Sequence, residues 1–298
     1  MPRTFSGSCN FLLKIHSSSR RRAAKKHENA RVAAFHSLVV GYWKAYGRHD
    51  LPWRRTRDPY AILVSEIMLQ QTQVNRVKPY FERWMRKFPT PQALASASLP
   101  SVLKEWQGLG YNRRGKLLRE CAKAIVEKHS GKVPKDREKL VALPAIGPYT
   151  AGAIRAFAFD EPEVFIETNI RAALLHHFFP RSKNVPDTKL MPILRKLILH
   201  AESPREWYAA FMDYGSHVKK AHPNPSRRSK HHTVQSKFEG SQRQLRGQLL
   251  RRLMDGPIAE SALVREQTKN TYRIEQVLRA MEAEGLLIKK GKSWQLAD

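Results

Sequence analysis

The chain is poor in cysteine and has no long apolar run. Its 298 residues include only two cysteines, Cys9 and Cys121, which lie far apart, so the sequence predicts no disulfide framework and a reducing compartment. No apolar run reaches the roughly 18 residues of a membrane span. Pro2 stands where N-myristoylation needs a glycine, and the segment after it lacks a secretory signal pattern. We therefore expect a soluble protein, cytoplasmic and close to the nucleoid if the source is a bacterium.

Acidic residues are also scarce. The chain has 26 Asp and Glu against 54 Lys and Arg, which gives a formal net charge of +28 and a sequence pI near 10.4. Charge of this size informs about partners and association rates more than about fold. A polyanion such as nucleic acid is the natural partner, and an acidic membrane surface is the alternative.

Composition divides the chain into four segments. Residues 1–28 are rich in Ser, Arg and Lys without periodicity, which predicts a basic disordered arm. Residues 29–220 carry apolar residues at helical spacing and no convincing strand, which predicts an all-α domain. Residues 221–241 turn polar and basic, as in a linker. Residues 242–298 combine three helical patterns with two β-prone segments that flank Lys290-Gly291-Lys292, a hairpin signal.

The helical patterns set the expected boundaries. After a first helix at residues 29–46 and a second that follows Asp58-Pro59, the spacing predicts helices at 76–88, 91–97, 100–107, 113–128, 137–143, 149–159, 168–178, 188–198 and 204–219. The last segment predicts helices at 242–254, 259–266 and 271–284. Helices followed by a basic hairpin look like a winged helix module, a fold that binds DNA in some proteins and other proteins in others. Both roles stay open here.

The stretch LPAIGPYTAG, residues 143–152, predicts a turn between two helices. Pro144 disfavours helix at Leu143, Gly147 permits a tight turn, and Pro148 opens a new helix. A helix that begins behind a glycine turn offers free backbone N–H groups, which favour an anion such as a phosphate. The stretch therefore indicates a hairpin that holds the DNA backbone. An ordinary pair of helices separated by a glycine is the alternative.

The second motif, VSEIMLQQTQV at residues 64–74, places a glutamate inside an apolar helix. Glu66 follows Ile62 and Leu63 on the preceding turn and precedes Gln70. Because poorly solvated surroundings disfavour negative charge, a carboxyl group there keeps its proton more readily and suits a general acid. A glutamate on the solvent side of the helix is the alternative.

Four motifs in this order resemble one enzyme family: Leu51-Pro52-Trp53-Arg54, the 65–74 helix, Gly108-Leu109-Gly110-Tyr111, and residues 143–153. They resemble the adenine mismatch glycosylases known as MutY, of the helix–hairpin–helix–GPD superfamily, over roughly residues 51–215. The resemblance implies an all-α helix–hairpin–helix glycosylase fold, here followed by a winged helix-like module. It also implies a monomer that flips a mismatched or damaged base out of double-stranded DNA and removes it, without membrane contact.

The resemblance also assigns site residues. It implies that Glu66 protonates the departing base, and that Gln71 and Tyr111 wedge into the duplex where the nucleotide leaves. Trp53 and Arg54 would line the base pocket. The hairpin would hold the DNA backbone through Leu143, Ala145, Gly147, Tyr149 and Thr150. A core aromatic is the alternative for Tyr111.

One departure from the family pattern concerns its second carboxylate. That residue is an Asp that opens the helix after the hairpin and stabilises the cationic sugar. The aligned position here holds Glu167, while Asn169 does match the pattern. A glutamate supplies the same charge one methylene further from the backbone, and catalysis needs placement within about an ångström. A helix cap without a catalytic role is the alternative for Glu167.

A second departure concerns the iron–sulfur cluster, whose four cysteines normally follow a Met-Asp-x-Gly element. Here Met212-Asp213-Tyr214-Gly215 is followed by no cysteine, and such a cluster needs thiolate ligands. Zinc is the alternative suggested by the histidines His217, His222, His231 and His232, but they lack an acidic or thiolate partner at fixed spacing. The sequence therefore predicts no metal and no cofactor.

Position 149 indicates the reaction type. Bifunctional relatives carry a lysine there, which forms a Schiff base with the sugar and then nicks the strand. Tyr149 cannot form that adduct, so we expect monofunctional hydrolysis that leaves an abasic site.

The substrate stays less defined than the reaction. The pocket motifs favour adenine opposite oxidised guanine or guanine, but the C-terminal segment is too short for the β-rich domain with which the family reads oxidised guanine. A thymine or uracil mismatch glycosylase of the same superfamily, and a catalytically inactive structure-specific DNA-binding protein, are the alternatives.

Overall fold

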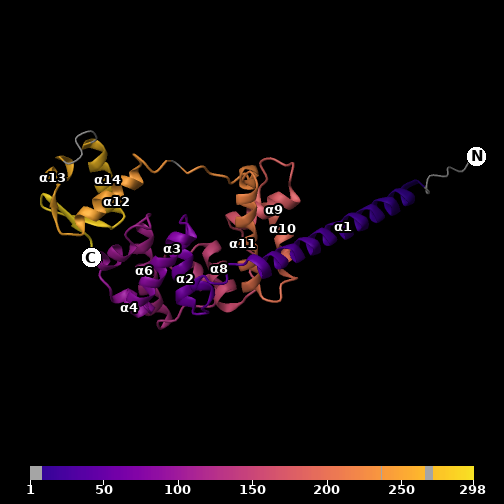
Figure 1. Cartoon of the computed structure of the whole chain (residues 1–298), viewed down its shortest axis with the longest axis horizontal. Helices are drawn as coiled ribbons and strands as arrows, with labels where there is room; N and C mark the ends of the chain where they lie inside the picture. The colour runs from indigo at the N-terminus through magenta and orange to yellow at the C-terminus, as the bar shows by residue number, and fades with distance from the viewer. Residues whose placement is uncertain (1–8, 236, 266–270) are drawn as a thin grey trace, which may run out of the picture. The chain divides into compact units, whose positions relative to one another are not determined.

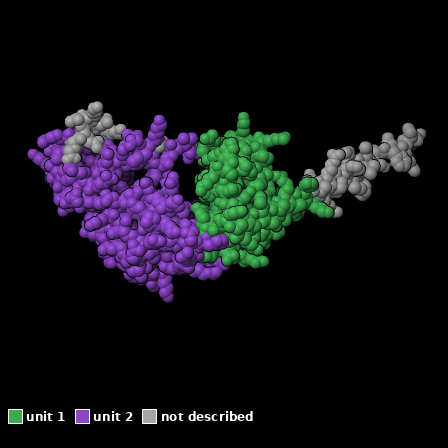
Figure 2. Space-filling view, in the orientation of Figure 1, with its two compact units in different colours: residues 1–48, 166–232 green, residues 49–165, 233–298 purple. Residues whose placement is uncertain are grey.

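The computed structural model describes the backbone of residues 9–235, 237–265 and 271–298, and the side chains of these residues except 9–25 and 271–273 (Figure 1). The chain divides into two compact units. Unit 1 comprises Met1–Arg48 and Ile166–His232, and unit 2 comprises His49–Phe165 and Thr233–Asp298 (Figure 2). Within the described residues, no helix is long and apolar enough to cross a membrane.

The described residues of unit 1 form four α-helices and one 3₁₀ turn. Its elements are α1 Cys9–Tyr46, α9 Thr168–Phe178, α10 Asp187–Ile198, α11 Pro204–Ala221 and η2 Pro225–Arg228. On α1, Val32, Phe35 and Val39 are buried at helical spacing, and the Phe35 ring packs edge to face on Phe211 of α11 with centroids 5.4 Å apart. This packing fixes α1 beside the α9–α11 pair that carries Glu167 and Asn169.

The helix α1 begins twenty residues earlier than predicted. It starts at Cys9, so the expectation of a disordered arm over residues 1–28 is wrong for residues 9–28; residues 1–8 lie outside the described residues. The segment is rich in Leu, Ala, Arg and Lys, which are good helix formers. The interpretation as an arm relied on the missing apolar periodicity and gave too little weight to these helix formers.

The first part of unit 2 is a cluster of short helices. It contains η1 Pro52–Arg54, α2 Pro59–Leu69, α3 Val74–Lys87, α4 Pro91–Ser96, α5 Leu99–Trp106, α6 Arg113–His129, α7 Arg137–Val141 and α8 Pro148–Phe159. The helix α2 is buried on all sides from Tyr60 to Met68, so it forms the centre of this unit. Trp84 of α3 and Trp106 of α5 pack edge to face in the same core, with ring centroids 5.4 Å apart.

The last part of unit 2, residues 242–298, is a small mixed module. It contains α12 Gln242–Leu253, β1 Ile258–Ala259, α13 Glu260–Arg265, α14 Thr271–Ala283, β2 Leu287–Lys290 and β3 Ser293–Leu296. The three antiparallel strands follow the order β1-β3-β2, and Lys290 pairs with Ser293 across the predicted hairpin. The hairpin is therefore confirmed, while β1 was not predicted because two residues give no alternation to read. The arrangement is consistent with a winged helix-like module.

The compact units do not follow the predicted segment boundaries. The 29–220 domain is divided between both units, and the predicted linker 221–241 is divided at residue 232. Val185 forms a parallel bridge with Ser229, and Arg228 donates from Nη1 and Nη2 to the carbonyl oxygens of Pro180 (2.8 Å) and Leu175 (3.0 Å). This main-chain bridge and the two side-chain bonds of Arg228 hold residues 225–229 on the rest of unit 1, and the composition of the segment gave no sign of them.

Candidate active site and DNA interface

Glu66 lies in the central helix of unit 2. Asp58 caps that helix by accepting hydrogen bonds from the N–H groups of Tyr60 (3.0 Å) and Ala61 (3.3 Å), and Pro59 occupies its first position. The Glu66 side chain is 7% exposed, so the predicted poorly solvated surroundings are present and the solvent-facing alternative is wrong. The hydroxyl of Tyr149 donates to Glu66 Oε2 at 3.3 Å.

Tyr149 reaches Glu66 from the hairpin side. It lies in the first turn of α8, and its ring packs edge to face against Phe165, with centroids 5.5 Å apart and an interplanar angle of 81°. The fold therefore brings together two of the predicted site residues, 83 positions apart in the sequence. A buried carboxyl group with a phenol hydroxyl beside it can hold a proton and deliver it to a nearby base.

The turn of the hairpin differs from the expected one. Ala145 has a φ of 66°, in the left-handed region, whereas Gly147 is extended, with φ −90° and ψ 176°. The prediction that Gly147 makes the tight turn is therefore wrong, because Ala145 makes it. A Cβ at Gly147 would meet nothing within 4 Å, and the residue is exposed. The glycine thus leaves open space in front of α8.

The helix α8 begins without a side-chain cap at Gly147. The neighbouring α7 is capped by Asp136, which accepts from the N–H of Lys139 at 2.9 Å. The first N–H groups of a helix lack partners within it, and the helix dipole favours an anion there. The start of α8 can therefore accept an anion from outside. Leu143 and Thr150 are buried, so a contact from these two predicted residues to DNA has to come from their backbone.

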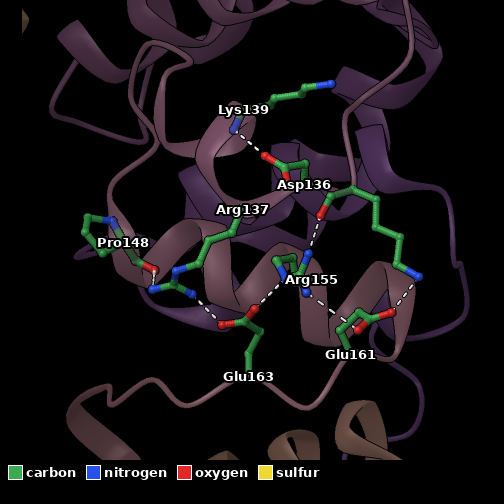
Figure 3. A network of polar contacts seen from close by, with 8 residues as sticks. Asp136, Arg137, Lys139, Pro148, Arg155, Glu161 and Glu163 are labelled. Carbon is green, nitrogen blue, oxygen red and sulfur yellow. Dashed lines mark hydrogen bonds and ion pairs between the residues drawn. The ribbon is translucent and has the colours of Figure 1, made fainter.

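A network of charged side chains joins the two helices of the hairpin, α7 and α8 (Figure 3). Glu163 accepts from both Arg137 of α7 and Arg155 of α8. Arg137 also donates to the carbonyl oxygen of Pro148 at 3.4 Å, and Arg155 donates to that of Lys135 at 2.6 Å. One carboxylate thus links both helices of the hairpin and fixes the exposed turn between them.

Glu167 is the N-cap of α9 in unit 1. Its Oε1 accepts from the N–H groups of Asn169 (2.6 Å) and Ile170 (2.8 Å), and its Oε2 accepts from the hydroxyl of Thr168 (3.0 Å) and the side-chain amide of Asn169 (3.3 Å). The additional methylene of glutamate is therefore accommodated by a normal capping geometry. The structure confirms the helix cap, and a catalytic role in addition to capping stays a prediction.

The charge of Glu167 is set by two opposing effects. Burial raises the pKa of its carboxyl group, although part of the side chain stays accessible to water. The hydrogen bonds from Ile170, Thr168 and Asn169, and the nearby charge of Lys219, offset part of that rise. Lys219 also donates from Nζ to Asn169 Oδ1 at 3.2 Å, so the cation is held beside the cap.

Gly215 allows α11 to pack closely against α9. A Cβ at this position would lie 2.1 Å from the carbonyl oxygen of Asn169, closer than any side chain permits. Two residues earlier, the buried Asp213 accepts from the backbone N–H and from Nε of Arg48, both at 2.7 Å. The Met-Asp-x-Gly element thus packs directly behind the Glu167 cap.

The two predicted wedge residues share a backbone conformation. Gln71 has a φ of 54° and Tyr111 a φ of 49°, in the left-handed region that residues with a Cβ seldom adopt. A single arginine, Arg114 of α6, holds both loops. Its guanidinium donates to the carbonyl oxygens of Ile67, Met68, Gln70, Leu109 and Gly110 and to the hydroxyl of Thr72, at 2.5–3.4 Å. Burial lowers the pKa of Arg114 to about 10, so it remains a cation at neutral pH.

The predicted pocket residues Trp53 and Arg54 lie in η1. Trp53 is 7% exposed and packs edge to face against Phe81, with centroids 5.5 Å apart. This packing is that of a core aromatic, so contact of Trp53 with a flipped base stays a prediction. Arg54 is partly exposed and ends the 3₁₀ turn.

The segment after Gly215 does not fit an iron–sulfur cluster, because it contains no thiolate ligand. Within the described part of the chain, no group of three or more His, Cys, Asp or Glu side chains is arranged to hold a metal ion. His222 instead stacks on His176 with ring centroids 4.4 Å apart. Val218 is buried, and Arg228 anchors the segment on α9 as described above.

Sequence reasoning missed three polar residues of the site: Arg114, Lys219 and Arg243. Arg114 follows the glycine-rich 108–111 loop by three positions, which is a usable signal for a residue that holds that loop. Lys219 contacts Asn169, 50 positions earlier, and Arg243 donates to the hydroxyl of Tyr111, 132 positions earlier. A single sequence carries no signal for contacts over such separations.

Comparison with known proteins gives a consistent family. Residues 64–204 match the family described as HhH-GPD superfamily base excision DNA repair protein. The chain is 33% identical over 274 residues to the adenine DNA glycosylase of Mycobacterium tuberculosis (strain ATCC 25618 / H37Rv), covering 82% of this chain and 88% of that protein. It is 46% identical over 150 residues to the adenine DNA glycosylase of Rattus norvegicus, covering 47% of this chain and 29% of that protein.

Solved structures agree at the level of the fold. A thermostable thymine-DNA glycosylase superposes with a TM-score of 0.56 at 24% identity, covering 63% of this chain and 87% of that chain. A non-covalent endonuclease III–DNA complex superposes with a TM-score of 0.52 at 18% identity, covering 63% and 84% of the two chains. At such identities the likeness concerns the fold alone.

Proposed function

Because the chain belongs to the adenine DNA glycosylase family of the helix–hairpin–helix–GPD superfamily, we propose that it excises adenine opposite oxidised guanine or guanine in double-stranded DNA. Family membership makes it a DNA glycosylase of base excision repair. The substrate, the roles of the side chains and action as a monomer are the proposal.

The buried pair of Glu66 and Tyr149 carries this proposal. Excision of adenine needs a proton on the departing base. With that proton the base leaves as a neutral molecule, whereas without it the base would have to leave as an unstable anion. Glu66 supplies that proton from a 7% exposed position, and the Tyr149 hydroxyl orients the carboxyl group through its 3.3 Å hydrogen bond. The proton moves from Glu66 to the base as the bond between base and sugar breaks.

Glu167 stabilises the sugar in the same step. Loss of the base leaves positive charge on the sugar, and a fixed carboxylate lowers the free energy of that charge. Its four hydrogen bonds hold the carboxylate in one orientation, so little reorganisation is needed when charge develops. Water then adds to the cationic sugar and loses a proton to the solvent, which leaves an abasic site.

The hairpin and the two wedge loops bind and distort the DNA. The uncapped start of α8 accepts a backbone phosphate, and Gly147 leaves room for its approach. Gln71 and Tyr111 enter the duplex and occupy the space that the flipped nucleotide leaves. The net charge of +28 supplies the general attraction to DNA.

A panel of duplexes tests the substrate. Each duplex carries one labelled adenine, thymine or uracil opposite guanine or oxidised guanine, and strand breaks are scored before and after hot alkali. We expect breaks at adenine, and only after alkali. Excision of thymine or uracil in preference to adenine would replace the proposed substrate with that of a mismatch glycosylase for those bases.

Borohydride trapping tests the reaction type separately. Tyr149 has no amine with which to form an imine, so borohydride should trap little protein on DNA. Strong trapping, with breaks that need no alkali, would instead assign a bifunctional mechanism and call for examination of Lys78 and Lys116.

A further inference from the structure

The C-terminal module shares a core with the glycosylase helices of unit 2. Leu99 and Leu103 of α5 are buried in the same apolar cluster as Leu249 and Leu253 of α12 and Leu287 of β2. At the end of the chain, Asp298 Oδ1 accepts from the N–H of Leu99 at 3.4 Å. The helix α5 ends at Trp106, directly before the loop with Tyr111. The module is thus fixed on the element that leads into the wedge.

Two side chains from the C-terminal part of unit 2 hold the phenol of Tyr111. Arg243 of α12 donates from Nη1 to the Tyr111 hydroxyl at 2.9 Å, and the amide of Gln235 donates to the same oxygen. The guanidinium carbon of Arg243 also lies 5.6 Å from the Tyr111 ring centroid, and that of Arg114 lies 5.5 Å from it. The ring therefore meets two cations and its hydroxyl meets two donors.

We propose that the C-terminal module completes the wedge, with Arg243 and Gln235 as positioning residues that aim the Tyr111 ring into the duplex. Arg114 and the left-handed backbone fix the Tyr111 loop, whereas the hydroxyl at the tip of the side chain is held by Arg243 and Gln235. Donors at the hydroxyl restrict the rotation of the side chain before DNA arrives, so less entropy is lost on insertion. The inference rests on the proposed wedge role of Tyr111, and it assigns the module a partner within its own chain.

Arg243 is also placed on a basic segment, so contact with a DNA phosphate is the competing role. The surrounding residues 227–246 contain Arg227, Arg228, Lys230, Lys237 and Arg246 against the single acid Glu239. A phosphate contact and a positioning contact differ in one respect. Only the positioning role depends on the Tyr111 hydroxyl.

A double-mutant cycle in the full-length chain tests the dependence. The variants are Arg243→Ala, Tyr111→Phe and both together, and Arg251→Ala removes the same charge from the exposed side of the same helix as a control. Base extrusion is followed with 2-aminopurine placed beside the target adenine opposite oxidised guanine, because its fluorescence rises when the stacked neighbour leaves. Thermal unfolding of each variant controls for folding.

We expect each single variant to slow the fluorescence rise about fivefold, the scale of one lost hydrogen bond, and the double variant to be no slower than either single one. Arg251→Ala should extrude the base at the wild-type rate. On a duplex whose target adenine is already unpaired in a bulge, Arg243→Ala should excise at nearly the rate of Arg251→Ala, because the wedge is then not needed.

Three results would overturn the inference. Additive losses in the double variant, with a weaker salt dependence for Arg243→Ala, would assign Arg243 to a phosphate. An unchanged rise in Arg243→Ala, with a normal wild-type rise, would remove the positioning role alone. The absence of any rise with the wild-type chain would overturn the proposed adenine substrate and the wedge together.

Discussion

The two carboxyl groups of the proposed mechanism have opposite surroundings. Glu66 lies in the middle of α2, a helix buried on all sides, and receives a hydrogen bond from the Tyr149 hydroxyl. Glu167 lies at the start of α9, where two backbone N–H groups, a hydroxyl and an amide donate to it and Lys219 is near. Burial favours the protonated form of a carboxyl group and raises the pKa of Glu167, whereas its donors and Lys219 favour the ionised form and offset part of that rise. The same side chain can thus serve as an acid in one place and as a fixed anion in another.

The largest effect is expected when Glu66 loses its acidic proton. Glu66→Gln keeps the shape of the side chain but has no acidic proton, so excision should fall by roughly 10²–10⁴, the usual contribution of a general acid. Single-turnover excision measures the loss, and binding to an uncleavable duplex should be unchanged. A variant that keeps the wild-type rate would remove Glu66 from the mechanism.

The next largest effect is expected from a substitution that shifts Glu167 without changing the residue itself. Gly215→Ala places a Cβ 2.1 Å from the carbonyl oxygen of Asn169, so α9 has to shift and Glu167 moves with it. We expect unfolding free energy to fall by about 1–3 kcal/mol and excision to slow by about tenfold or more. Gly247→Ala on α12 is the matched control, because a Cβ there meets nothing within 4 Å. Equal stability and rate in the two variants would contradict the close packing.

A smaller effect concerns the orientation of the first group. Tyr149→Phe removes the hydroxyl that donates to Glu66 and keeps the ring that packs on Phe165. One lost hydrogen bond corresponds to about 1 kcal/mol, so excision should slow by about fivefold. Strand breaks should still need alkali. A loss as large as that of Glu66→Gln would instead give Tyr149 a direct role in the chemistry.

The smallest effect is a change of pH dependence. Glu167 acts ionised, so the rate should fall as the pH drops through its pKa, which burial holds above the ordinary value. Lys219 lowers that pKa, so Lys219→Ala should raise it further and move the acid side of the pH–rate profile to higher pH. The rate on the plateau should change little. A shift to lower pH, or none, would show that Glu167 does not set this side of the profile.

Much of this site could be predicted from the sequence, and the rest depends on tertiary contacts. The bounds of α9 were predicted to the residue, because Glu167 and the following apolar pattern are local signals. The burial of Glu66 followed from its apolar neighbours. The turn at Gly147 was misjudged, because glycine is the usual left-handed residue and Ala145 took that conformation. The contact between Arg243 and Tyr111 spans 132 positions and joins side chains whose own segments gave no indication of it.

The most direct test of this account compares Glu167→Gln with Glu167→Asp in single-turnover excision of adenine opposite oxidised guanine. Glutamine can still accept the backbone N–H groups and keep the cap, so the unfolding temperature should change little. Without the negative charge, however, the rate should fall on the order of 10² or more. Aspartate restores the side chain typical of the family and should keep most of the rate if the backbone is unchanged. A Glu167→Gln variant with the full wild-type rate would contradict the account, because Glu167 would then be a helix cap only.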